Sequence, residues 1–114
     1  MYIGDGMEAL LKIIENNNDC AKNKIFNIGN AAENISIRQL AEMLICLIKQ
    51  YPKYAELAEK TKLVDVSAEA YYGKGYQDVT LRVHSLKRIE KELGWQPTTN
   101  MEEGLKKTLD FYLA

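Results

Sequence analysis

The shortage of strands limits the fold of this chain more than any other feature. Only two short runs have strand character, at residues 24–28 (KIFNI) and 62–67 (KLVDVS). A doubly wound sheet needs more strands than this, so the chain cannot build an independent one. We therefore expect an α/β fragment of the α+β kind, a mainly helical subdomain that carries two short strands.

Helix signals fill most of the remaining sequence. Three capping boxes, in which two side chains three residues apart satisfy free backbone amides, predict three helix starts. They begin at Asp5, Ser36 and Asn100. A further helix over residues 86–93 is closed by Gly94, a usual left-handed stop. Residues 53–60 are polar and are interpreted as a shorter helix.

Bulk composition excludes several classes of protein. The chain has 114 residues, which suits one small compact domain. Its formal net charge of −1 argues against general attraction to nucleic acid or to anionic membranes. No apolar run approaches the roughly 20 residues that span a bilayer, and no signal-peptide pattern opens the chain. Cys20 and Cys46 lie far apart, so we expect free thiols and a cytoplasmic location.

Motifs for cofactors and metals are scarce. Gly4, Gly6 and Ala9 match a loose dinucleotide fingerprint, but no full strand precedes them. No acidic residue stands about 20 residues later to hold a ribose hydroxyl. No Tyr-x-x-x-Lys pair and no metal-spaced Cys/His set occurs. We therefore expect a capped helix at this glycine motif, and neither cofactor nor metal bound by this chain alone.

Functional residue types gather in residues 68–82, which have neither helical nor strand periodicity. They include Tyr71, Tyr72, Gly73, Lys74, Gly75, Tyr76 and Arg82. The tyrosines offer flat faces and hydroxyls for a base or sugar, and the glycines let backbone approach a ligand. Lys74 and Arg82 can meet phosphates or a carboxylate. On composition alone, a surface turn whose tyrosines cover the small core explains these residues equally well.

Several stretches, in this order, resemble one enzyme family. Residues 27–30 (NIGN) followed by 36–41 (SIRQLA) are similar to a signature in the C-terminal region of the extended short-chain dehydrogenases/reductases, also called NAD-dependent epimerases/dehydratases. Residues 93–97 (LGWQP) followed by 101–105 (MEEGL) resemble the terminal pattern of the same enzymes. The resemblance runs from residue 3 to residue 113.

Within that family, residues 71–79 (YYGKGYQDV) with Arg82 most resemble the UDP-glucuronic acid decarboxylase domain of bifunctional polymyxin-resistance proteins. That resemblance implies oxidative decarboxylation of UDP-glucuronic acid on the way to aminoarabinose-modified lipid A. It also implies NAD and a Tyr-x-x-x-Lys pair in a Rossmann domain that this chain lacks. Residues 1–114 would then be the C-terminal substrate-binding subdomain, inactive by itself.

The same resemblance suggests roles for single residues. Arg82 would be catalytic, because it would contact the substrate and assist proton transfer after carbon dioxide leaves. Tyr76 would contact the nucleotide sugar, and Tyr72 and Lys74 are the other substrate-binding candidates. Arg38, on a helix outside the loop, is expected to tolerate substitution.

The implied partners are a UDP-sugar, the missing Rossmann half and, in a homo-oligomer, a second copy of the chain, with no nucleic acid or membrane. The isolated chain is expected to expose an apolar face and to self-associate, because too little sheet is present to cover its helices. Two alternatives stand beside the decarboxylase. One is a fragment of a related nucleotide-sugar epimerase or dehydratase, and the other is a truncated module without catalytic function.

Overall fold

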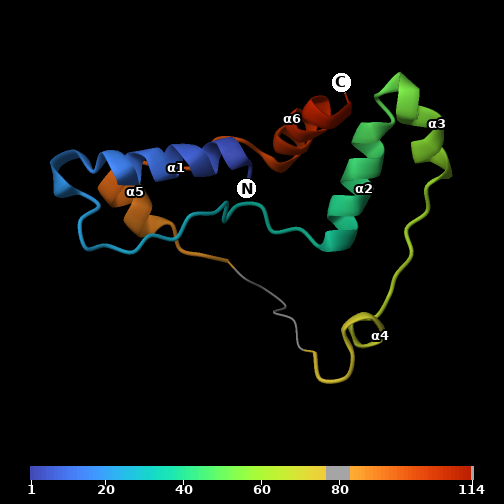
Figure 1. Cartoon of the computed structure of the whole chain (residues 1–114), viewed down its shortest axis with the longest axis horizontal. Helices are drawn as coiled ribbons and strands as arrows, with labels where there is room; N and C mark the ends of the chain where they lie inside the picture. The colour runs from blue at the N-terminus through green and yellow to red at the C-terminus, as the bar shows by residue number, and fades with distance from the viewer. Residues whose placement is uncertain (77–82, 114) are drawn as a thin grey trace. The chain divides into compact units, whose positions relative to one another are not determined.

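The computed structural model describes residues 1–76 and 83–113. Figure 1 shows the helices of these residues in chain order: α1 (Ile3–Glu15), the 3-10 helix η1 (Asn17–Asp19), α2 (Ile37–Ile48), α3 (Pro52–Lys60), α4 (Ala68–Tyr72), α5 (Lys87–Leu93) and α6 (Met101–Leu113). The chain divides into two compact units. The first unit is Met1–Ser36 with Val83–Ala114, and the second is Ile37–Arg82.

The predicted α/β fragment with two short strands is wrong, because the described residues form helices and connecting segments without any strand. Residues 24–28 and 62–67 have no regular secondary structure. A strand forms only where a second backbone pairs with it, and these two runs belong to different units. The two runs are apolar and prone to form strands, but neither has a second backbone paired with it, so neither forms a strand.

Side chains, instead of a strand ladder, hold residues 24–28 in the first unit. The Arg88 Nη1 donates to the carbonyl oxygen of Ile25 at 3.1 Å, and the side-chain Nδ2 of Asn27 donates to the carbonyl oxygen of Ser85 at 3.3 Å. These two hydrogen bonds join residues 24–28 to the start of α5. The segment is fixed by contacts that period-2 patterning in the sequence does not reveal.

The core of the first unit surrounds Trp95. Trp95 and Ile89 are each 1% exposed and pack with Ala9, which is fully buried. Phe26, Ile28, Leu86 and Leu93 pack around them. Helices α1 and α5 lie side by side (Figure 1), so the core lies between these two helices and the segment of residues 24–28.

Asp5 is not a helix cap, contrary to the sequence prediction. Helix α1 already begins at Ile3, and the N-cap Tyr2 makes no side-chain capping bond. The Asp5 carboxylate instead accepts hydrogen bonds from the Thr98 hydroxyl (3.1 Å), the Thr99 amide (3.1 Å) and the Thr99 hydroxyl (3.0 Å). The carbonyl oxygen of Asp5 accepts from the Trp95 indole at 3.1 Å. Asp5 therefore ties α1 to the segment before α6.

The environment of Asp5 lowers its pKa. Burial by itself raises the pKa of this carboxyl group, but the hydrogen bonds from Thr99 and Thr98 to the carboxylate outweigh that effect. The side chain is only 5% exposed, so it stays ionised because its charge is matched by donors.

Other predicted helix ends are confirmed. The Asn100 side chain accepts from the Glu103 amide at 2.9 Å, immediately before α6. Gly94 ends α5 with a left-handed φ of +59°, and its amide donates to the carbonyl oxygen of Glu90 at 2.9 Å. Helix α2 begins directly after Ser36, and the short helix predicted over residues 53–60 is α3.

The second unit packs α2 against α3. Leu47 of α2 and Ala58 of α3 are its most buried apolar residues, at 4% and 5% exposed.

The predicted free thiols are confirmed, since neither Cys20 nor Cys46 forms a disulfide. None of the helices within residues 1–76 and 83–113 combines the length and apolar character needed to cross a membrane.

Candidate functional site

The candidate site predicted from the sequence begins with a short helix that the sequence pattern did not reveal. The Ser67 hydroxyl accepts from the Ala70 amide at 3.1 Å and caps α4 at its start. Gly73 ends α4 with a φ of +92°, and Gly75 follows with a φ of +90°. Glycine adopts such angles without the steric cost that other residues meet, so the pair turns the chain back beside α4.

This turn brings the tyrosines together in what we call the tyrosine cluster, Tyr71, Tyr72 and Tyr76. The rings of Tyr72 and Tyr76 stack with centroids 4.4 Å apart and an interplanar angle of 22°. The ring of Tyr71 meets Tyr72 edge-on, with centroids 4.8 Å apart. All three are exposed, at 73%, 62% and 45% in chain order. The cluster is thus an open aromatic surface and not a cover for the core.

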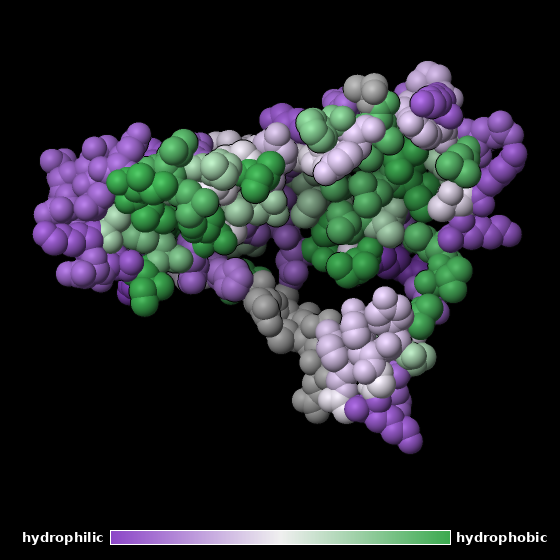
Figure 2. Space-filling view, viewed as in Figure 1, coloured by the Kyte–Doolittle hydropathy of each residue, from purple (hydrophilic) through white to green (hydrophobic). Residues whose placement is uncertain are grey.

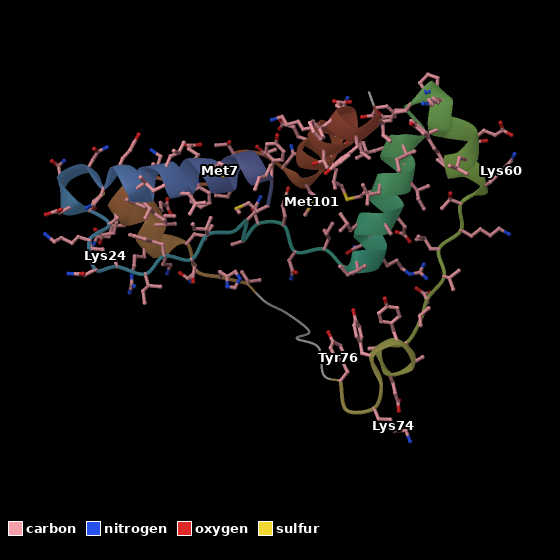
Figure 3. All side chains as sticks on the ribbon, viewed as in Figure 1. Met7, Lys24, Lys60, Lys74, Tyr76 and Met101 are labelled. Atoms are coloured by element: carbon pink, nitrogen blue, oxygen red, sulfur yellow. The ribbon has the colours of Figure 1, made fainter. Side chains whose placement is uncertain are left out.

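The charged candidates are placed differently. Lys74 is exposed at the tip of the turn, and Figure 3 shows it pointing away from Tyr76. The structure therefore brings Tyr72 and Tyr76 together but does not bring Lys74 to them. Arg82, the predicted catalytic residue, lies outside the described residues.

An ion pair missed by the sequence analysis anchors the segment that leads into α4. The Arg38 guanidinium binds the Asp65 carboxylate, and it also lies 3.5 Å from the Glu42 carboxylate on α2. The hydrogen bond that Arg38 donates to Asp65, together with the negative charge of Asp65, raises the pKa of Arg38, and Glu42 adds to the effect. Asp65 stands two residues before the cap Ser67. Arg38 is therefore linked to the predicted site and is not a neutral comparison for it.

The glycine motif near the N-terminus does not fit a dinucleotide. Gly4 and Gly6 lie inside α1, and Gly6 is buried in the first unit. A dinucleotide site needs a strand followed by a glycine turn at the start of a helix, with amides free to face a pyrophosphate. Among the residues that the structure describes, no three His, Cys, Asp or Glu side chains gather as a metal site.

The chain is similar to a solved protein of greater length. No protein-family model matches the chain. The crystal structure of the PbgP3 protein from Burkholderia pseudomallei matches it with a TM-score of 0.82 and 36% sequence identity. The match covers 98% of this chain and 30% of that chain, so this chain spans less than a third of the length of PbgP3.

Proposed function

We propose that this chain is the C-terminal substrate-binding part of an NAD-dependent nucleotide-sugar enzyme. The proposed reaction is oxidative decarboxylation of UDP-glucuronic acid, within the lipid A modification that gives polymyxin resistance. The tyrosine cluster carries the proposal, because it presents stacked, exposed rings where the family resemblance expects the substrate loop. The likeness to PbgP3 across 98% of the chain supports the same family.

The chemistry of the substrate suits this loop. A UDP-sugar acid combines a planar base, a diphosphate and a carboxylate, and exposed tyrosine rings bind planar groups and sugar faces. A ketone at C4 of the sugar is β to the C6 carboxylate. Loss of carbon dioxide therefore leaves the electron pair of the broken bond on the ketone oxygen, and C5 must then take up a proton.

We assign substrate contact and assistance of this proton transfer to Arg82. Arginine keeps its charge at all relevant pH values and offers a planar fork of donors for phosphate or carboxylate oxygens. The required NAD would be held by a Rossmann domain, since the glycines of α1 do not fit it. Tyr72 and Tyr76 would hold the nucleotide sugar.

The test uses this chain fused behind the part of PbgP3 that lies outside the match, assayed for carbon dioxide release from UDP-glucuronic acid. Arg82→Ala is expected to lower the rate about 100-fold, the effect of losing one charge-assisted contact worth about 2–4 kcal/mol in the transition state. Arg82→Lys should restore little of it, because a point charge does not replace the fork.

Lys60→Ala is the matched control, because it also removes one positive charge from the second unit. Lys60 pairs with Glu56 on the surface of α3, at 71% side-chain exposure, so its loss should leave the rate unchanged. Equal rates for Arg82→Ala and Lys60→Ala would contradict the role of Arg82. Turnover of a different nucleotide sugar by the fusion would favour the related epimerase or dehydratase.

A further inference from the structure

Residues 61–67, which we call the connecting segment, join α3 to α4 and lead the chain to the tyrosine cluster. They have no regular secondary structure. Their larger apolar side chains are exposed, with Leu63 at 38%, Val64 at 81% and Val66 at 60%. Burial therefore contributes little to fixing this segment, so the contacts of its polar groups decide how well it is held.

The packed part of the second unit lies in α2 and α3. Leu47 and Ala58 are buried there, whereas every residue from 61 to 76 is exposed. Figure 2 shows strongly apolar side chains gathered over α2, while the α4 turn, yellow in Figure 1, presents weakly polar ones. On its N-terminal side, the tyrosine cluster is therefore joined to the packed helices through the connecting segment.

The Arg38 guanidinium ties the connecting segment to α2. Its Nη2 donates to the Asp65 carboxylate, and its Nη1 lies 3.5 Å from Oε1 of Glu42, one turn further along α2. Because a different nitrogen meets each acid, Glu42 holds the planar guanidinium in the orientation that presents Nη2 to Asp65. Arg38 belongs to the first turn of α2, the helix that buries Leu47, so one end of this tie is fixed.

Asp65 transmits this restraint to the tyrosine cluster over a short stretch of chain. It stands two residues before Ser67, whose hydroxyl accepts from the Ala70 amide and whose carbonyl oxygen accepts from the Tyr71 amide, each at 3.1 Å. The next residue along α4, Tyr72, stacks on Tyr76. A restraint at Asp65 thus fixes the start of the helix that carries the cluster.

We propose that Arg38, acting through Asp65, is a positioning residue for the tyrosine cluster and thereby for nucleotide-sugar binding. This inference rests on the proposed function, in which the cluster receives the substrate. It adds a residue outside the loop that keeps the cluster in its binding arrangement. A site that is correctly arranged for only a fraction of the time binds with its affinity reduced by that fraction. Because Arg38 does not act on the reacting atoms, its loss raises KM and leaves kcat nearly unchanged.

The exposure of the pair sets the size of the effect. The side chains of Arg38 and Asp65 are 53% and 75% exposed. Water and salt weaken ion pairs at such positions. Breaking one changes an equilibrium constant by about fivefold at most.

The first measurement is amide hydrogen exchange of the 114-residue chain, followed residue by residue with NMR. The amides of Tyr71 and Gly73 donate to carbonyl oxygens at 3.1 and 3.0 Å around α4, so their exchange reports on the opening of this helix. Asp65→Asn and Arg38→Gln should each speed their exchange about three- to fivefold. Exchange at Leu47 should stay as in the wild type, which shows that the packed helices remain folded.

Glu56→Gln is the matched control for Asp65→Asn. It also removes an exposed acid from the second unit, one that is 82% exposed and pairs with Lys60 on α3. Exchange at Tyr71 and Gly73 should stay within about 1.5-fold of the wild type in this variant. Equal exchange in Asp65→Asn and Glu56→Gln would overturn the proposal.

Two double variants separate the tie from unrelated effects of each substitution. Arg38→Gln with Asp65→Asn should speed exchange no more than either single change, because both remove the same contact. Arg38→Glu with Asp65→Arg should bring exchange back toward the wild-type rate, because it restores an ion pair with its charges exchanged. Additive effects in the first double variant, or no recovery in the second, would contradict a tie between these two residues.

The second measurement uses the fusion of this chain behind the unmatched part of PbgP3, with UDP-glucuronic acid as substrate. Arg38→Gln and Asp65→Asn should each raise KM about three- to fivefold and leave kcat within about twofold. Glu56→Gln should change neither constant. An unchanged KM, or a fall in kcat with KM unaltered, would overturn the positioning role.

The two proposals fail in different ways. A fusion that releases no carbon dioxide removes the proposed reaction, and the exchange measurement then decides by itself whether Arg38 positions the cluster. A fusion whose kinetics respond to Arg82→Ala but not to Arg38→Gln keeps the proposed reaction and removes the present inference.

Discussion

Replacing Asp5 by alanine should destabilise the first unit strongly. The carboxylate accepts hydrogen bonds from the Thr98 hydroxyl and from both the amide and the hydroxyl of Thr99. Alanine leaves the amide of Thr99, a residue only 7% exposed, without that partner, which costs about 1–3 kcal/mol. The loss of the hydroxyl contacts adds to this, while the better helix propensity of alanine returns about 0.5 kcal/mol. We expect a net loss of about 3 kcal/mol.

Asp5→Asn separates the charge of this group from its shape. The asparagine oxygen can accept from the Thr99 amide, and its amino group can donate to the hydroxyls of Thr98 and Thr99, which rotate to suit. The contacts survive as neutral hydrogen bonds, which are about half as strong as charge-assisted ones. We therefore expect a smaller loss of about 1–2 kcal/mol.

Urea unfolding of the 114-residue chain measures both changes. Trp95 is the only tryptophan, is 1% exposed and donates its indole N–H to Asp5, so its fluorescence reports on this unit. Glu103→Gln is the control, because it removes an exposed acid whose partner is Lys107 at 2.8 Å, and should change the free energy by less than about 0.5 kcal/mol. If Asp5→Ala were no more destabilising than Glu103→Gln, the interpretation of Asp5 as a tie would be wrong.

Three further outcomes are expected. The pKa of Asp5 is lowered in the folded chain, so its contribution to stability is present above the unfolded pKa of about 3.9 and is lost as the pH falls through the folded value. Acid titration followed by unfolding should therefore destabilise the wild type more steeply than Asp5→Asn below about pH 4. Gly94→Ala should lower the unfolding free energy by about 1 kcal/mol in urea, since alanine must adopt a φ of +59°, and a gain in stability would contradict the left-handed cap. The double variant Leu10→Lys with Ile14→Lys should bind less of a dye that fluoresces on apolar surfaces than the wild type does. Equal dye fluorescence of the variant and the wild type would show that the exposed apolar face of α1 (Ile3, Met7, Leu10, Leu11 and Ile14) does not bind the dye.

Helix positions were the part of the fold that local sequence could predict. Asn100 and Gly94 mark helix ends because an N-cap side chain and a left-handed stop act within a few residues. The same logic failed at Asp5, where a capping pattern was present but the side chain found donors 93 and 94 residues away. A local motif predicts only which local bonds are available, not whether distant ones replace them.

The candidate site could be predicted in composition and only partly in arrangement. The sequence contains the tyrosines and glycines of residues 71–76, and it therefore indicates an aromatic turn. The stacking of Tyr72 on Tyr76 and the outward direction of Lys74 depend on backbone angles at the two glycines. The tie between Arg38 and Asp65 joins residues 27 apart in sequence, and neither residue's neighbours give a signal for it.

The sequence by itself determined that this chain is built from amphipathic helices, because periodicity and caps are local properties. Only the tertiary structure decided that residues 24–28 and 62–67 are not strands, since strand formation requires a second backbone that neither run finds. The tertiary structure also decided which side of α1 is buried. Asp5 and Ala9 face the core around Trp95, and the more apolar side stays exposed, because the hydrogen bonds to Thr98 and Thr99 fix the helix in that rotation.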